Sequence, residues 1–365
     1  MAFPRSSQIF SSHHPVYLCA SLRDAAKALA PLTGERPAFL VTERRLLGVL
    51  RPLVAGLRES VPGLRVVAFP GGERNKTRET KARLEDALLA SGAARDAVLL
   101  ALGGGVVTDL AGFTAGTYLR GVPWVALPTT LVGMVDAALG GKTGVDTDRG
   151  KNLVGLFHPP LAVISLLPAL DTLPPKEFRA GLAECLKHGL SLDAAYLRWL
   201  RGRRPETLRT DAQLRRRLIA RSAALKCAVV DEDPREETGR RNVLNVGHTV
   251  GHALERLSGF TLGHGEAVAE GLAWEAAAAA VQGHLGRREA KQVREDVLRL
   301  GFKPRWRRWS PAEIIEAAGA DKKNRRGEVR YVPLGGLGRT ALPPPHTALL
   351  DRASLSAAFG LLEGD

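Results

Sequence analysis

The sequence is poor in cysteine and in aromatic residues and has no long apolar run, and each shortage excludes a class of protein. Its three cysteines lie far apart without a C-x-x-C pair, which argues against a disulfide framework and a thiolate zinc site. The charge-free apolar stretch Ala97–Thr108 contains three glycines and is too short to cross a bilayer. Aromatic residues make up only 5% of the chain, so side chains on which nucleic-acid bases could stack are scarce. These shortages predict a protein of the reducing cytoplasm that binds neither membranes nor nucleic acid.

What the chain has in excess is positive charge, with 52 Lys and Arg against 38 Asp and Glu and a net charge of +14. The surplus is densest in residues 201–241 and 287–308. There the arginines alternate with acidic and aliphatic residues, as in LRRRLIARSAALK, which is typical of a helix with one solvated and one buried face. An anionic small-molecule substrate therefore explains the charge better than nucleic acid does. Residues 1–20 contain no continuous apolar run, which argues against a secretory signal.

The length of 365 residues and the pattern of apolar residues predict two domains. In the first half, short β-rich runs alternate with amphipathic helical patterns, which predicts an α/β domain with a Rossmann-like parallel sheet over residues 1–172. From Pro175 onward strand patterns nearly vanish, which predicts an all-α domain over residues 173–365, with the prolines of LDTLPPKEF at the join. The expected strands are Ala38–Thr42, Arg65–Phe69, Ala97–Leu102, Trp124–Leu127 and Ala162–Ser165, and the expected helices are Glu177–Leu190, Leu214–Val230, Val243–Leu257, Glu266–Gln282 and Arg288–Leu300.

The first motif with chemical content is a triglycine turn, Gly103-Gly104-Gly105, between an apolar strand pattern and a helical pattern. Glycines let the backbone approach a phosphate, and a helix N-terminus offers free N–H groups, so the turn suits a diphosphate. The Rossmann fingerprint is incomplete, because Thr108 stands where its third glycine should be and no acid follows about twenty residues on. By itself the motif is equally typical of a tight strand-to-helix turn.

The second motif is a set of four possible metal ligands, Glu184, His248, His252 and His264, in segments that read as helices or helix starts. His248 and His252 are four residues apart and share one helix face. Imidazole and carboxylate ligands without thiolates favour a catalytic Zn²⁺ with an open position, and the lack of H-E-x-x-H argues against a zincin peptidase. Any one of these histidines alone is more typical of helix packing or capping. Three of the nine histidines, in NVGHTVGH and LGHGEA, together favour a metal site.

Six lysines share Gly-, Asp- or Asn-rich surroundings in a chain that otherwise prefers arginine. Lysine is a compact point charge that suits phosphate. Each of them alone is typical of the protein surface, but together they predict a phosphate pocket. They are Lys76, Lys142, Lys151, Lys187, Lys322 and Lys323.

With these motifs in place, the sequence resembles the 3-dehydroquinate synthases. The match runs from about Ala38 to Thr340, and eight blocks in the right order are far more specific than any single motif. The blocks are FPGGERNKTRET, ALGGGVVTDLAGFTAGTYLRGVP, LPTTLVGMVDAALGGKTGVD, GKNLVGLFHP, LDTLPPKEFRAGLAECLKHGL, RNVLNVGHTVGHALE, LGHGEAVAEGL and DKKNRRGEVRYVPLGGLG.

The resemblance implies a phosphate-eliminating lyase of the shikimate pathway, which supplies aromatic amino acid biosynthesis. Its substrate would be the sugar phosphate 3-deoxy-D-arabino-heptulosonate 7-phosphate, and its products 3-dehydroquinate and phosphate. The implied steps are transient oxidation by NAD at C5, β-elimination of phosphate, reduction, ring opening and an intramolecular aldol closure. The implied cofactors are a catalytic NAD and Zn²⁺ or Co²⁺, and the implied assembly is a homodimer.

Carried across residue by residue, the resemblance implies four groups of site residues. It places the metal on Glu184, His248 and His264, and the catalytic groups on Asp136, Lys142, Lys187, Asn245 and His252. It places further substrate contacts on Arg120, Asn152, Lys226, Arg241 and Lys322, with Arg120 reaching the substrate phosphate of the neighbouring subunit. It places NAD against Glu73, Lys76, Gly103, Gly104, Gly105, Asp109, Thr129, Thr130, Lys142, Lys151 and Thr172.

The chain departs from the family pattern at two places. After the strand AFLVT the family has an Asp and an Asn that hold the adenosine, whereas this chain reads TERRL, with Glu43 as the possible replacement. Asp146 stands where the family has the Asn of GKTGVN, which points to an altered loop rather than altered chemistry. Residues 1–35 and about twenty-five C-terminal residues contain no usable motif.

Two other kinds of enzyme remain as alternatives. Iron-dependent alcohol dehydrogenases and glycerol dehydrogenase share the two-domain plan, but they lack LGGKTG and DKK and bind metal through an Asp with histidines. Other sugar phosphate cyclases share the mechanism, and the retained Gly140–Lys142 favours dehydroquinate among their products. An amino-dehydroquinate synthase is the hardest of these to separate by sequence.

Overall fold

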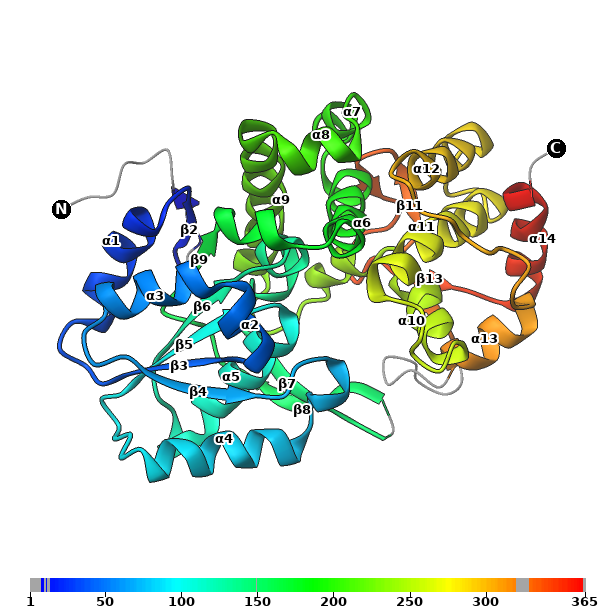
Figure 1. Ribbon diagram of the computed structural model, residues 1–365. Coiled ribbons are helices and arrows are strands. Elements are labelled where there is room, and N and C mark those ends of the chain that lie inside the picture. Colours follow the sequence, from blue (N-terminus) through cyan, green and yellow to red (C-terminus); the bar gives the residue numbers. More distant parts are fainter. Residues whose placement is uncertain (1–7, 10, 12–13, 149, 320–327, 364–365) are drawn as a thin grey trace. The chain divides into compact units, whose positions relative to one another are not determined.

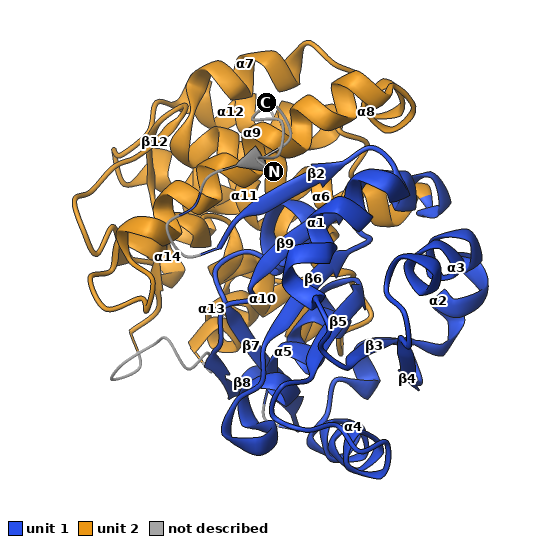
Figure 2. Cartoon of the chain, turned by 90° about the vertical axis from the view of Figure 1, so that its left-hand side faces the viewer, with its two compact units in different colours: residues 1–174 blue, residues 175–365 orange. Residues whose placement is uncertain are grey.

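The fold is described from a computed structural model, which places residues 8–9, 11, 14–148, 150–319 and 328–363 (Figure 1). The chain divides into two compact units, unit 1 from Met1 to Pro174 and unit 2 from Pro175 to Asp365 (Figure 2). The division therefore falls two residues after the expected join at Thr172. No helix in the placed residues is long and apolar enough to cross a membrane.

Unit 1 is built on a seven-stranded sheet with the strand order β1-β2-β9-β6-β5-β3-β4. β1 (Gln8–Ile9) pairs antiparallel with β2 (Val16–Cys19), and β2 and the other five strands pair in parallel, which confirms the expected parallel sheet. Every residue of β3, β5, β6 and β9 is buried, as in sheets covered by helices on both faces. The five expected strands all form, with ends within one residue of those expected, as β3 (Ala38–Glu43), β4 (Arg65–Phe69), β5 (Val98–Gly103), β6 (Trp124–Pro128) and β9 (Ala162–Leu166).

Helices cover both faces of this sheet (Figure 1). Leu29 of α1 (Leu22–Thr33) and Leu57 of α3 (Arg51–Ser60) pack with Leu40, Leu100 and Ile164 of the strands in one apolar core. α5 (Gly105–Thr117) packs against β5 and β6, and α4 (Arg78–Ala90) packs against α5. The remaining short elements are α2 (Arg44–Val49), η2 (Glu73–Asn75), η3 (Tyr118–Arg120), η4 (Gly133–Ala137) and η5 (Leu167–Thr172).

An antiparallel hairpin, β7 (Lys142–Thr147) with β8 (Gly150–Phe157), was not among the expected strands. Its sequence, KTGVDT and GKNLVGLF, mixes glycines and charges and so lacks a clear two-residue alternation. β7 packs against α5, and the hairpin places Asp146 of β7 and Asn152 of β8 close to Lys76.

Unit 2 is mostly helical, which agrees with the expected helical domain except that four short strands also form. These are β10 (Arg330–Tyr331), β11 (Leu334–Gly336), β12 (Arg339–Thr340) and β13 (Ala348–Leu349). The helical elements are α6 (Pro175–Leu192), α7 (Ala194–Arg201), α8 (Pro205–Thr210), α9 (Ala212–Glu232), η6 (Arg240–Asn245), α10 (His248–Leu257), α11 (His264–Val281), α12 (Arg287–Arg299), α13 (Pro311–Gly319) and α14 (Arg352–Glu363).

The prediction of one continuous helix over Val243–Leu257 was wrong, because η6 ends at Asn245 and α10 begins at His248. Between them Gly247 has φ +79°, a left-handed conformation that favours glycine. A Cβ on Gly247 would lie 2.7 Å from the Leu272 side chain, and one on Gly271 would lie 2.0 Å from the Gly247 carbonyl oxygen. The backbones of α10 and α11 therefore approach closely, with the start of α10 against the middle of α11.

Candidate active site

Three predicted metal ligands from three helices meet in unit 2. Glu184 lies inside α6, while His248 and His264 are the first residues of α10 and α11. Glu184 Oε1 lies 3.0 Å from His264 Nε2 and 3.7 Å from His248 Nε2. One donor atom from each residue falls within 4.8 Å of the others, and Glu184 is fully buried. A carboxylate and two imidazoles at this spacing fit a divalent cation such as Zn²⁺ or Co²⁺.

The electrostatics of the two histidines suit metal binding. Burial, assisted by the Lys187 cation, holds the pKa of His248 well below its usual range, so its imidazole is neutral and has a lone pair to donate. Burial also acts to lower the pKa of His264, but hydrogen bonds to Glu184 and Glu255 outweigh it and raise that pKa to about 10. A cation bound here would take the place of the proton shared by His264 and Glu184.

Two predicted catalytic residues lie beside these ligands. Lys187 is one turn along α6 from Glu184, and its Nζ lies 2.6 Å from Glu184 Oε2 with both groups buried. His252 is one turn along α10 from His248, with ring centroids 5.4 Å apart. The His252 ring lies 6.4 Å from that of His264. The structure therefore gathers an ammonium group and a third imidazole around the three metal donors.

The other predicted substrate residues of unit 2 lie on elements that pack against α6. Lys226 is buried on α9, and Arg241 and Asn245 lie on η6. Arg241 is 2% exposed, and its guanidinium donates to the Pro234 carbonyl oxygen at 2.9 Å. The Asn245 side chain donates to Asn242 Oδ1 at 3.5 Å. Lys322, another predicted contact, and Lys323 lie outside the residues that the structure describes.

In unit 1 the triglycine turn closes β5 and opens α5, as predicted. The Thr129 N–H donates to the Gly103 carbonyl oxygen at 2.9 Å, and a Cβ on Gly104 would lie 3.0 Å from the Thr130 methyl group. A Cβ on Gly105 would meet only Ala137, at 3.4 Å. The predicted cofactor residues of this turn are thus assembled around a helix N-terminus with open backbone.

A buried lysine organises the second group of predicted cofactor residues. Lys76 is 3% exposed, and its Nζ donates to Asp109 Oδ2 and Asn152 Oδ1, at 2.5 Å each. Burial acts to lower the pKa of Lys76, but the carboxylates of Asp109, Glu73 and Asp146 together outweigh it and the pKa is raised. Nearby, Lys151 Nζ lies 3.9 Å from Glu73 Oε1. Four predicted NAD residues and the predicted substrate residue Asn152 therefore form one charged network.

Asp146, the departure from the family pattern, belongs to the same network. Its N–H donates to the Lys76 carbonyl oxygen at 2.8 Å, and its Oδ1 accepts from the Asn152 N–H at 2.8 Å. Burial raises the pKa of Asp146 to about 6, although the Lys76 cation and the Asn152 bond act in the opposite direction. Asp146 thus fixes the backbone of Asn152, which has φ +54°.

The remaining predicted residues of unit 1 lie on short elements. Asp136 is half-buried in η4, and Lys142 is an exposed residue at the start of β7. Arg120 is exposed at the end of η3. Thr172, the last residue of η5, donates its hydroxyl to the Ala169 carbonyl oxygen at 2.9 Å.

Glu43, the possible replacement for the family's adenosine contact, ends β3 next to β5. It is 3% exposed, accepts from Arg45 Nε at 2.6 Å, and packs so closely on Gly71 that a Cβ there would lie 2.3 Å from Glu43 Oε2. The structure places this carboxylate at the carboxyl end of the strand beside the triglycine strand, where dinucleotide folds hold the ribose. Adenosine binding by Glu43 stays a prediction.

Two buried carboxylates of this region were missed from the sequence. Glu255 Oε1 lies 3.6 Å from His264 Nδ1, and its position three residues after His252 was the available signal. Glu275 of α11 accepts from the N–H groups of Gly247 at 2.7 Å and Val250 at 3.0 Å, at the start of α10. No local pattern marks Glu275, because its partners are brought to it only by the packing of α10 on α11.

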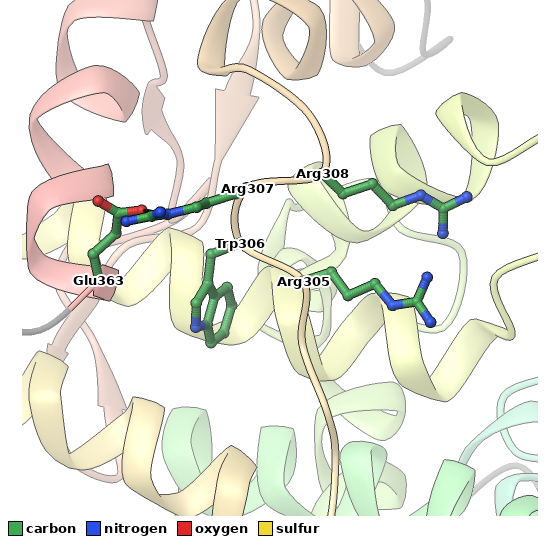
Figure 3. A pocket seen from close by; sticks show the side chains of 5 residues that line it. All are labelled: Arg305, Trp306, Arg307, Arg308 and Glu363. Atoms are coloured by element: carbon green, nitrogen blue, oxygen red, sulfur yellow. Dashed lines mark hydrogen bonds and ion pairs between the residues drawn. The ribbon is translucent and has the colours of Figure 1, made fainter.

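A surface pocket of unit 2 lies elsewhere, lined by Arg305, Trp306, Arg307, Arg308 and Glu363 (Figure 3). Arg307 pairs with Glu363, whereas Arg305 and Arg308 point away from that pair (Figure 3). None of the predicted site residues that the structure describes lines this pocket. It is therefore part of the basic surface and not of the site assembled above.

Comparison with known proteins gives consistent matches along most of the chain. The sequence profile of the 3-dehydroquinate synthase N-terminal family matches residues 66–180, and that of the 3-dehydroquinate synthase C-terminal family matches residues 181–324. The 3-dehydroquinate synthase of Pelobacter propionicus is 41% identical over 78% of this chain and 79% of its own. That of Halorhodospira halophila is 40% identical over 89% of this chain and 91% of its own.

Solved structures show the same fold. A 2-epi-5-epi-valiolone synthase from Streptomyces hygroscopicus, with NAD⁺ and Zn²⁺ bound, is 28% identical, with a TM-score of 0.85 over 96% of this chain and 97% of its own. A 2-deoxy-scyllo-inosose synthase complexed with carbaglucose-6-phosphate, NAD⁺ and Co²⁺ is 23% identical, with a TM-score of 0.81 over 98% of this chain and 99% of its own. A probable glycerol dehydrogenase from Sinorhizobium meliloti matches less well, with a TM-score of 0.60.

Proposed function

The chain belongs to the 3-dehydroquinate synthase family, and we propose that it converts 3-deoxy-D-arabino-heptulosonate 7-phosphate to 3-dehydroquinate and phosphate. The observation that carries this proposal is the meeting of Glu184, His248 and His264 with Lys187 beside them, in a chain of this family. The donor set suits a Lewis acid, and the adjacent cations suit an anionic sugar phosphate.

Unit 1 supplies the residues that would hold NAD. The backbone of Gly103, Gly104 and Gly105 leaves room for a diphosphate at the start of α5. The charged network of Lys76, Asp109, Glu73 and Lys151 would hold the rest of the cofactor, together with Thr129, Thr130, Lys142 and Thr172. When bound, NAD supplies a transient hydride acceptor at the substrate C5, so no net oxidation results.

Unit 2 supplies the groups that would act on the substrate. Glu184, His248 and His264 would hold a divalent cation, which supplies Lewis acidity to the substrate hydroxyl groups. Lys187 and His252 lie within this cluster and would hold and move protons at the reacting oxygens. Lys226, Arg241, Asn245 and Lys322 would bind the substrate's carboxylate and phosphate. In unit 1, Asp136, Lys142 and Asn152 are proposed as further substrate contacts. The substrate phosphate itself would take part in removing the proton.

The proposal extends to the assembly and its location. We propose a homodimer in which Arg120 of one subunit reaches the phosphate in the site of the other, and a cytoplasmic location. The exposed position of Arg120 supports the shared site of a homodimer. The three cysteines, which are buried and free, support the cytoplasmic location.

One assay tests the activity. The purified full chain is incubated with the heptulosonate phosphate, NAD⁺ and Zn²⁺, and phosphate release is followed together with dehydroquinate formation. Both products should accumulate in equal amounts while absorbance at the NADH band stays flat. Stoichiometric NADH would instead identify a polyol dehydrogenase, and turnover only of an amino-substituted substrate would identify an amino-dehydroquinate synthase.

A further inference from the structure

The buried carboxylate of Glu255 is not used by the chemistry described above. Glu255 lies on α10, two turns from His248, and is 2% exposed. Its Oε1 lies 3.6 Å from His264 Nδ1, while the opposite ring nitrogen, Nε2, lies 3.0 Å from Glu184. The His264 imidazole is therefore held between two carboxylates from two different helices.

We propose, resting on the metal site of the proposed function, that Glu255 is a positioning residue that orients His264 for metal binding. An imidazole that donates its Nε2 lone pair to a metal carries its proton on Nδ1. The Glu255 carboxylate lies 3.6 Å from Nδ1, and a small closing of this distance would let it accept the hydrogen bond of that proton and so fix both the tautomer and the ring rotation. Without this partner the ring is free to turn Nε2 away from Glu184 and His248.

Burial strengthens the argument for a dedicated role. A carboxylate excluded from water is costly unless it is paired, and the His264 ring is a partner that the structure shows. Glu255 and His248 act from one rigid helix on the two sides of the metal cluster.

A second arrangement competes with this one. His252, Glu255 and His264 also have donor atoms within 4.8 Å of one another, so Glu255 could itself be a ligand. The arrangement with Glu184, His248 and His264 as the ligands is favoured, because the Nε2 atoms of His248 and His264 face the same oxygen of Glu184. In this arrangement Glu255 supports the ligand set from outside it.

The experiment measures metal binding by the metal-stripped full chain, without substrate. Co²⁺ is titrated by visible absorption and Zn²⁺ by competition with a chelating dye, for the unaltered chain and for Glu255→Ala and Glu255→Gln. Glu266→Gln is the matched control, because Glu266 is near His264 in the chain but pairs with the exposed Lys176. His248→Ala and His252→Ala are titrated in parallel to identify the ligands.

Loss of such a supporting carboxylate weakens metal affinity by about 10–100-fold, and we expect this for Glu255→Ala, with one metal still bound at saturation. Glu255→Gln should lose less, because its amide oxygen still accepts from Nδ1–H, and Glu266→Gln should bind like the unaltered chain. Affinity of Glu255→Ala within about twofold of the unaltered chain would overturn the proposal. So would loss of binding in both Glu255→Ala and His252→Ala with binding retained in His248→Ala, because Glu255 would then be a ligand.

Circular dichroism shows whether each variant folds. If Glu255→Ala does not fold, Glu255→Met, which fills the space but offers no acceptor to Nδ1–H, takes its place, and an affinity within about twofold of that of Glu266→Gln would refute the positioning role. Because no substrate is present, these results are separate from the activity assay. Absence of dehydroquinate formation with the expected affinity pattern would refute the proposed function and leave the role of Glu255 intact.

Discussion

At the scale of single residues, the two units contain charged groups that are buried only because another charge is placed against them. Lys187 and Glu184 are almost completely inaccessible and lie 2.6 Å apart, and Lys76 lies between Asp109 and Asn152. Burying an unpaired charge costs several kcal/mol or more, so each of these charges is stable in the interior only with its partner in place. Such pairs concentrate in both units at the residues proposed to bind cofactor, metal and substrate, which is where perturbed groups are expected.

The first prediction separates the metal ligands from their neighbour His252. Ala at Glu184, His248 or His264 should each abolish tight metal binding, because each removes one of three converging donors. His252→Ala should keep one metal and lose at least about 100-fold in kcat, the scale of a lost general acid or base. Metal analysis and steady-state kinetics on the four variants check this. A metal-free His252→Ala beside a metal-replete His264→Ala would reverse the assignment.

The second prediction concerns the pH dependence of stability at Asp146. Its pKa is about 6 in the folded chain against 3.8 as the ordinary value, so between pH 4 and 6 the folded state holds a proton that the unfolded state releases. The contribution of Asp146 to the free energy of unfolding is therefore present at low pH and is lost as pH rises through about 6. Asn keeps the acceptor for the Asn152 N–H without the charge, so Asp146→Asn should be more stable than the unaltered chain above pH 6.

Chemical denaturation at pH 4 and pH 7.5 measures this difference in the free energy of unfolding. The two proteins should differ least at the lower pH, because the folded-state carboxyl of Asp146 is then protonated and uncharged, as Asn is, while the unfolded-state carboxyl is only partly ionised. A difference that does not change with pH would show that Asp146 does not titrate in this range.

At the scale of elements, the glycines of the triglycine turn have different tasks. A Cβ on Gly103 would lie 2.3 Å from Val107, inside the first turn of α5, whereas a Cβ on Gly105 would meet only Ala137 at 3.4 Å. The first glycine is therefore required by the packing of β5 on α5. The third glycine, Gly105, is not required by packing, so its backbone is open to a ligand.

The third prediction follows from this contrast. Gly103→Ala should lower the free energy of unfolding by about 1–3 kcal/mol, the usual cost of overpacking a core. Gly105→Ala should fold at least as well as the unaltered chain and weaken NAD binding about tenfold or more, which is about 1.4 kcal/mol. Urea denaturation and calorimetric NAD titration measure the two effects. Unchanged NAD affinity in a folded Gly105→Ala would show that the turn does not hold the cofactor.

Elements with a strong local pattern were the ones that the sequence predicted well. The buried strands β3, β5, β6 and β9 are mostly apolar runs, and the triglycine turn is recognised directly from its three consecutive glycines. The β7–β8 hairpin and the break at Gly247 were missed because tertiary contacts decide them, β7 against α5 and Gly247 against Leu272. The same holds for Glu275, whose hydrogen bonds to Gly247 and Val250 join residues far apart in the chain.

At the scale of the whole molecule, much of the arginine surplus in unit 2 serves the packing of helices. Arg201 of α7 makes three hydrogen bonds to the fully buried Asp296 of α12, and Arg299 donates to the same carboxylate. Arg221 pairs with Asp193 in the same way. The basic segments noted in the sequence are thus partly structural.

Arg120 is held rigidly although it is exposed. It has φ +70°, Leu119 before it has φ +49°, and Gly121 after it has φ +115°. Non-glycine residues in this left-handed region cost about 1 kcal/mol or more and persist where the surroundings fix them. Here the Tyr118 hydroxyl donates to the Ala93 carbonyl oxygen at 2.7 Å, and the Val122 N–H donates to the Ala115 carbonyl oxygen at 2.8 Å. Such a turn fixes the backbone of Arg120, and its side chain is exposed.

The last prediction is that the Arg120 guanidinium completes the active site of a second subunit, because a planar fork of donors grips a phosphate at two points. Arg120→Ala and Glu184→Ala should each be inactive, the first through substrate binding and the second through metal binding. The two variants are then dissociated, mixed and reassociated, with tagged chains to count mixed dimers. A shared site leaves one intact site in every mixed dimer, so activity should return to about half of that of the unaltered dimer per mixed dimer. A site closed within one chain leaves every site damaged, and a mixture that stays inactive although mixed dimers form would refute the sharing.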